Sequence, residues 1–106
     1  MTDPRFNVLA KNLVSFSTSL KPGESVLLDM FDVPDEMTVA LIRAARKIGA
    51  IPIVQIHHGR VSREFALDAQ EKGLTTLAGV QLAQMKKMHA YIAIRGGLNI
   101  AETSDV

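Results

Sequence analysis

The sequence predicts an α/β fold, a small three-stranded and mainly parallel sheet with helices on both faces. Three apolar runs of strand length, at residues 25–31, 51–57 and 89–95, alternate with stretches of helical periodicity. Since a helix joins each strand to the next, the strands should run parallel, as in a Rossmann-like three-layer unit. The 106 residues suffice for a single α/β domain, 1–106.

The first half of the chain reads as helix, strand, helix. Asp3 and Pro4 suit the start of a helix over residues 4–19, because Asp caps free amides and Pro lacks an N–H. A Pro22-Gly23 turn precedes the uninterrupted apolar run 25–31, which is typical of a strand covered on both faces. Asp32 and Pro34 should open the next helix, which ends near residue 48.

The second half repeats this alternation. Gly49 is the expected helix stop, and a second strand follows at 51–57. We expect helices at 62–72, closed by Gly73, and at 76–88, the latter presenting Leu77, Val80, Met85 and Met88, of which the two methionines are most simply core residues. The third strand, 89–95, ends at a pair of glycines. The strand order should be 2-1-3 or 3-2-1.

Composition excludes several classes of protein. The net charge of +1 argues against nucleic-acid binding through a broad basic face. Without cysteine there is no disulfide, thiolate metal site or cysteine nucleophile. The N-terminus carries no secretory signal and no apolar stretch is long enough to span a membrane. We therefore expect a cytoplasmic protein without nucleic-acid or membrane partners.

Ligands of open α/β sheets bind beyond the carboxyl ends of the strands, where Asp29, Asp32, Arg95 and Asn99 are the candidate cleft residues. The loop after the first strand is acidic and lacks glycine, which disfavours a phosphate or dinucleotide site. Its acids could hold a cation or an amine, although Asp32 is more simply a helix cap. Arg95 could bind a carboxylate or pair with Asp29 or Asp32.

The pair His57-His58 suggests a metal site, but neighbouring residues of a strand point to opposite faces and cannot share an ion. A structural or solvent-exposed role is the simpler interpretation. No nucleophile, base and acid with catalytic spacing occur together, and no GxSxG motif is present. We expect no catalytic residue, metal site or cofactor site in this segment.

Five stretches of the chain resemble the N-terminal region of the thermophilic-type metallo-aminopeptidases, the family of aminopeptidase T and leucyl aminopeptidase. Each is generic by itself, but their order and spacing together resemble the family over nearly the whole chain. They are LAKNLV at 9–14, LKPGESVLL at 20–28, AARKIGA at 44–50, IRGGLN at 94–99 and SDV at 104–106.

The resemblance implies a dimeric enzyme that removes leucine-like residues from peptide N-termini with two divalent metals, zinc or cobalt. The metal ligands of this family lie later in the chain. Residues 1–106 would then be the non-catalytic N-terminal part of a longer two-domain protein, acting on peptide substrates as a homodimer. A dioxygenase that cleaves dihydroxypyridine rings shares the architecture. The alternative is a free-standing α/β binding or assembly module for a small amine or cation, with an acidic pocket near Asp29 and Asp32.

Overall fold

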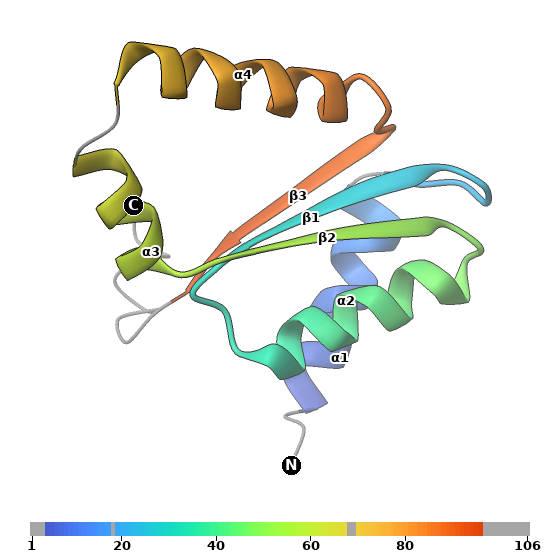
Figure 1. The fold of residues 1–106 in the computed structure, drawn as a ribbon. Coiled ribbons are helices and arrows are strands. Elements are labelled where there is room, and N and C mark those ends of the chain that lie inside the picture. Colours follow the sequence, from blue (N-terminus) through green and yellow to red (C-terminus); the bar gives the residue numbers. More distant parts are fainter. Residues whose placement is uncertain (1–3, 18, 68–69, 97–106) are drawn as a thin grey trace.

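A computed structural model describes residues 4–17, 19–67 and 70–96 of the chain. It contains a three-stranded parallel sheet in the order β2-β1-β3 (Figure 1), which confirms the α/β prediction and the first of the two expected strand orders. The elements are α1 (Pro4–Asn12), the π-helix η1 (Leu13–Ser17), β1 (Ser25–Phe31), α2 (Asp35–Lys47), β2 (Ile51–His57), α3 (Gly59–Leu67), α4 (Glu71–Met85) and β3 (Ala90–Arg95).

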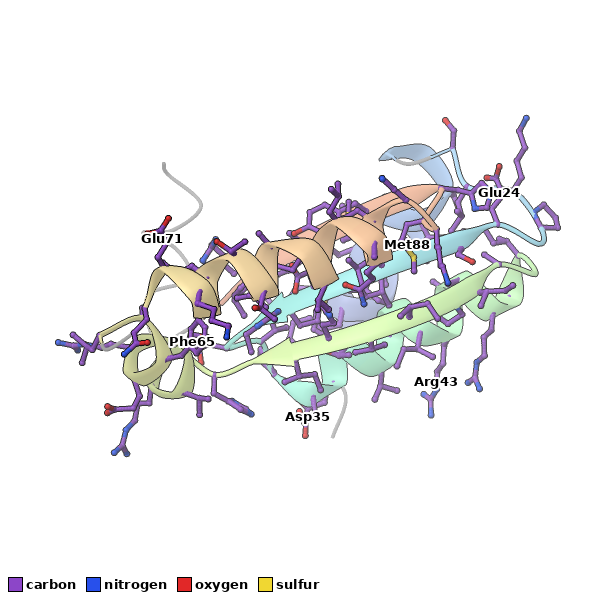
Figure 2. The ribbon with its side chains drawn as sticks, turned by 45° about the horizontal axis from the view of Figure 1, so that its top comes forward. Glu24, Asp35, Arg43, Phe65, Glu71 and Met88 are labelled. Carbon is purple, nitrogen blue, oxygen red and sulfur yellow. The ribbon has the colours of Figure 1, made fainter. Side chains whose placement is uncertain are left out.

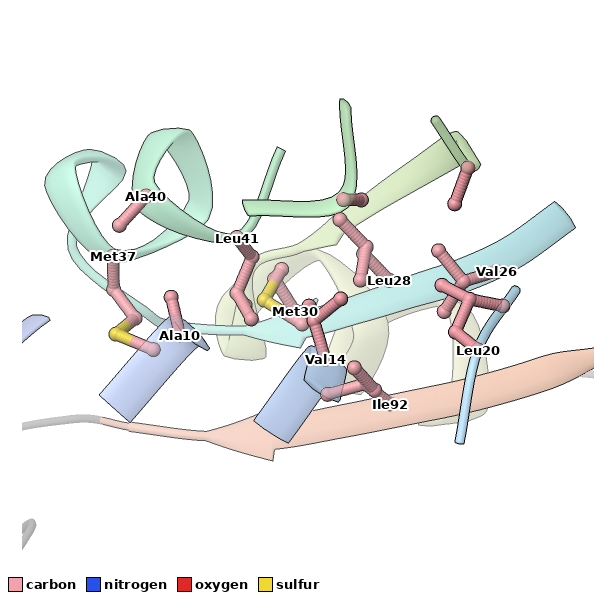
Figure 3. Packing of buried hydrophobic residues seen from close by; sticks show 12 residues of the cluster. Ala10, Val14, Leu20, Val26, Leu28, Met30, Met37, Ala40, Leu41 and Ile92 are labelled. Carbon is pink, nitrogen blue, oxygen red and sulfur yellow. The ribbon is translucent and has the colours of Figure 1, made fainter. Parts of the chain in front are cut away.

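One face of the sheet is packed. Helices α1 and α2 both lie against it (Figure 1), and alternate residues of β1 point into the layer between helices and sheet. Leu28 and Met30 are fully or almost fully buried there, together with Val14 and Leu41 (Figure 3). Burying a side chain of this size contributes about 1.5–3 kcal/mol, so this layer is the main source of stability.

Two tight turns, which precede β1 and β2, are hydrogen-bonded to each other. Pro22 and Gly23 form a turn closed by a 3.1 Å hydrogen bond from Glu24 N to Lys21 O, and the positive φ of Gly23 (85°) suits the third position of a type II turn. Gly49, at φ 82°, ends α2 as predicted. The amide of Gly23 donates to Gly49 O over 2.9 Å, which joins the two turns.

The opposite side of the sheet carries α3 and α4, which lie away from α1 and α2 (Figure 1). Neither helix contains a buried residue, and many of their side chains point away from the rest of the chain (Figure 2). No described helix has the length and apolar character needed to cross a bilayer. Large apolar side chains that stay exposed on α3 and α4 are Val61, Phe65, Leu67, Leu74, Leu77, Val80, Leu82 and Met85.

The helix boundaries correct three predictions. The expected first helix changes at Leu13 from α-helix to π-helix. The expected break at Gly73 is wrong, because α4 begins at Glu71 and runs through this glycine, which has open space around it. The predicted core role of Met85 is also wrong, since Met85 is exposed like Leu77 and Val80, whereas Met88 is half-buried.

Candidate functional site

The packing of α1 and α2 on one face leaves the other set of β1 side chains, among them Asp29 and Phe31, on the opposite face of the sheet. Parallel pairing puts Asp29 opposite Gln55 and Ala93, and Phe31 opposite His57 and Arg95. Paired residues of a parallel sheet point to the same face, and residues two apart along a strand share it. The register therefore gathers residues from all three strands near their carboxyl ends.

Asp29 is the centre of this polar cluster. Its side chain lies in an otherwise largely apolar sheet, and the residue is only 9% exposed. Oδ2 accepts a 2.7 Å hydrogen bond from the hydroxyl of Tyr91, and Oδ1 accepts one from Nε2 of His57. Because an ionised carboxylate only accepts, Nε2 of His57 carries the proton of this bond. The two partners satisfy the buried carboxylate from both sides.

The electrostatic effect of this cluster is visible at Tyr91. Its hydroxyl donates to Asp29, and this bond raises the pKa of Tyr91 above the ordinary value of 10.0, since it favours the protonated phenol. Partial burial and the negative charge of Asp29 raise this pKa further, while Arg95 lowers it by a smaller amount. The field of Asp29 therefore outweighs that of Arg95 at this position.

A stack of side chains crosses the sheet next to Asp29. The rings of Phe31 and His57 lie 4.3 Å apart, centroid to centroid, at an interplanar angle of 10°. The guanidinium carbon of Arg95 lies 4.3 Å from the centroid of the same Phe31 ring, a distance typical of a cation–π contact. Within the described part of the chain, Arg95 pairs with neither Asp29 nor Asp32.

The side chain of Asp32 is not part of this cluster. Its backbone has a positive φ of 54°, and its Oδ1 accepts a 2.9 Å hydrogen bond from the amide of Gly59, the first residue of α3. The prediction that Asp32 caps the helix after β1 is wrong, because α2 has Pro34 at its N-cap position and no side-chain cap. Asp32 caps α3 instead. Asn99 lies outside the described residues.

The described backbones at the carboxyl ends of the three strands, beyond which ligands of such sheets usually bind, lie close together. The amide of Gly96 donates to Phe31 O over 2.8 Å, and the amide of Asp32 donates to His57 O over 3.0 Å. A Cβ on Gly96 would come within 2.6 Å of Asp32 O. Among the described residues, the candidate site is the cavity on the face of the sheet.

This face borders a cavity of about 1020 Å³. Its floor is formed by Asp29, Phe31 and His57, while α3 and α4 supply the walls and roof, among them Phe65 and Leu77. Figure 2 shows Phe65 beside the end of the sheet where α3 begins. A smaller cavity of about 230 Å³ lies between the C-terminal part of α4 and the middle of the sheet, with Asp29 again in its lining.

The arrangement can bind through hydrogen bonds and apolar contact. A two-metal centre does not fit it: the cluster offers one carboxylate and one imidazole, already bonded to each other. Among the residues with described positions, no three His, Cys, Asp or Glu side chains gather closely enough to hold an ion. His58 follows β2 as an exposed residue and has no place in the cluster.

The sequence led to Asp29 and Arg95 but not to their neighbours. For His57 the sequence favours a structural or solvent-exposed role, and it gives no indication of a role for Tyr91. The signal that connects them is the period of two along parallel strands, which places Asp29, His57 and Tyr91 on one face once the order β2-β1-β3 is known.

A comparison with protein families and with curated proteins found no family model and no curated sequence that matches this chain.

Proposed function

We propose that this chain is the non-catalytic N-terminal α/β domain of a metal-dependent aminopeptidase, which removes leucine-like residues from the N-termini of peptides. The domain forms one wall of the substrate cleft. Residues of the longer protein outside 1–106 would bind the two divalent metals, zinc or cobalt, which would activate the attacking water. The enzyme acts as a homodimer.

The resemblance to the aminopeptidase family supports this proposal, because stretches of this chain that resemble the family take part in the same fold contacts. The turn in 20–28 is hydrogen-bonded to the helix stop in 44–50 through Gly23 and Gly49. The stretch 9–14 supplies two fully buried residues, Ala10 and Val14. Gly96, from the fourth stretch, fits where a larger residue would collide with Asp32. The resembling stretches thus supply two turns, a strand end and part of the packed layer of this fold.

The observation that carries the cleft-wall role is the cavity above the open sheet face. It is about 1020 Å³ in volume, at the upper end of the roughly 300–1,000 Å³ typical of ligand pockets. Its floor contains the buried carboxylate of Asp29, and its roof is largely apolar. A peptide with a free amino group and a leucine-like side chain presents the complementary chemistry.

The test is hydrolysis of leucine p-nitroanilide by the protein encoded by the complete reading frame that contains this chain. We expect release of p-nitroaniline with zinc or cobalt and its loss with EDTA. The control substrate is N-acetyl-leucine p-nitroanilide, whose blocked amine an aminopeptidase should refuse. Failure to cleave the free substrate with either metal, or equal cleavage of both substrates, would contradict the proposal.

A further inference from the structure

The large cavity has two chemically distinct sides. The sheet contributes a polar floor, in which Asp29 is the acidic group. Helices α3 and α4 contribute apolar side chains, among them Val61, Phe65, Leu77 and Val80. Figure 1 shows α4 diverging from the strands towards their carboxyl ends, so the space between these two sides widens where Asp29, Phe31 and His57 lie.

The carboxylate in the floor has room for a further partner. Its two oxygens each have one described hydrogen bond, from Tyr91 and from His57. A carboxylate has about four lone-pair positions, so about two remain for donors from a ligand. The nearest guanidinium, that of Arg95, is held over Phe31 and does not pair with Asp29 among the described contacts.

The charge in the floor favours a cation. At Tyr91, which touches Asp29, the negative charge of the carboxylate has a larger effect than the positive charge of Arg95. Lys72 also lines the cavity, but from α4, whereas Asp29 belongs to the sheet. A cationic group on the floor therefore meets the carboxylate at close range and the lysine across the cavity.

We propose that this cavity binds a primary amine that carries an apolar side group. The ammonium group donates hydrogen bonds to Asp29, and the apolar group packs against Phe65, Leu77 and Val80. The sequence suggested an amine site formed by Asp29 and Asp32. The structure replaces Asp32, which caps α3, with the hydrogen-bonded cluster of Asp29, His57 and Tyr91.

A small free amine and the N-terminus of a peptide share this chemistry. The inference goes beyond the proposed function, since the site belongs to this chain whether or not the chain is part of a peptidase. The cleft-wall role proposed above rests on the same cavity, so the test uses no metal and no catalytic readout, and a failure to bind amines is distinguishable from a failure to hydrolyse peptides.

The experiment is an NMR titration of the 106-residue chain with leucinamide. We expect saturable shifts of the backbone amides of Asp29, Leu77 and Tyr91. N-acetyl-leucinamide, which lacks the cation, and glycinamide, which lacks the apolar group, should bind at least about tenfold more weakly, the loss expected for one charge-assisted hydrogen bond or one buried side chain. Leu-Gly-Gly distinguishes the sources: affinity similar to that of leucinamide identifies a peptide N-terminus, and weaker binding identifies a small amine.

Two variants and a control locate the site. Asp29→Asn keeps an acceptor for Tyr91 but removes the charge, and should weaken leucinamide binding about tenfold or more. Asp35→Asn, an equal change of charge at the exposed start of α2, should leave it unchanged. Leu77→Lys alters an exposed residue and places a second cation in the roof, so it should abolish binding without unfolding the chain.

The inference is overturned if leucinamide produces no saturable shifts, or if its acetylated form binds equally well. Unchanged affinity in Asp29→Asn would also overturn it. Should Asp29→Asn lose its folded spectrum, Leu77→Lys decides: wild-type affinity in that variant contradicts the site, and loss of binding supports it.

Discussion

Asp29 is the residue on which the candidate site depends. It is almost buried, yet its carboxylate is satisfied by groups from the two neighbouring strands, which avoids the cost of a buried polar group without a partner. Sequence reasoning could single out Asp29 because it lies near the carboxyl end of the first strand, where open α/β sheets bind their ligands. It could not identify His57 or Tyr91 as partners, since they are 28 and 62 residues away and meet it only through the strand order.

The titration of Tyr91 tests this cluster directly. The chain contains one tyrosine and no tryptophan, so the ultraviolet absorbance of the phenolate reports on this residue alone. We expect Tyr91 to titrate above pH 10.0 in the folded protein, and Asp29→Asn to lower its pKa by removing the charged acceptor. Asp35→Asn should leave the titration unchanged. An identical pKa in wild type and Asp29→Asn would contradict the hydrogen bond.

The same shift has a consequence for stability. The folded state raises the pKa of Tyr91 and so holds its proton more tightly than the unfolded state. This contribution is fully present below the unfolded pKa and is lost as pH rises through the folded pKa. We expect the free energy of unfolding to fall above about pH 10 more steeply in wild type than in Tyr91→Phe, as measured by urea denaturation. Parallel pH profiles would refute the coupling.

A substitution of Gly96 tests the close approach of the ends of β1 and β3. A methyl group there would approach Asp32 O to 2.6 Å, so Gly96→Ala forces the ends of β1 and β3 apart. We expect a loss of about 1–3 kcal/mol in the free energy of unfolding, the usual range for overpacking. Gly79→Ala is the matched control, because nothing lies within 4 Å of a Cβ at that helical position. Equal stability of the two variants would contradict the close approach of Gly96 to Asp32.

At the scale of elements, the strands were predictable and the outer helices were not. β1 and β2 have the predicted bounds, and β3 begins one residue late. Apolar runs set between turn residues explain this agreement. The predicted boundary between α3 and α4 is wrong because Gly73 does not end a helix. A glycine inside a helix with open space around it only weakens that helix.

The two helix layers should differ sharply in their sensitivity to substitution. Leu41 of α2 is 0% exposed and Leu82 of α4 is 57% exposed, and both lie inside helices. Leu41→Ala should reduce the free energy of unfolding by about 2–5 kcal/mol, because it leaves a cavity in the core. Leu82→Ala should change it by less than about 0.5 kcal/mol. Similar losses in urea denaturation would show that α4 packs as tightly as α2.

At the scale of the whole molecule, one sheet face is packed and the other bounds a cavity. The sequence predicts helices on both sides, and they are present. It could not predict the difference between the layers, because the apolar residues of α4 read as a core face although they are exposed. The prediction that β1 is covered on both faces is confirmed, since Leu27 and Asp29 on the opposite face are only 2% and 9% exposed.

We propose that this chain binds and positions a substrate and does not itself catalyse the hydrolysis. The most direct measurement is the rate at which the purified 106-residue chain releases p-nitroaniline from leucine p-nitroanilide in the presence of zinc or cobalt. We expect a rate equal to that of the protein-free blank. Release that is proportional to the concentration of the chain, and that EDTA abolishes, would contradict it.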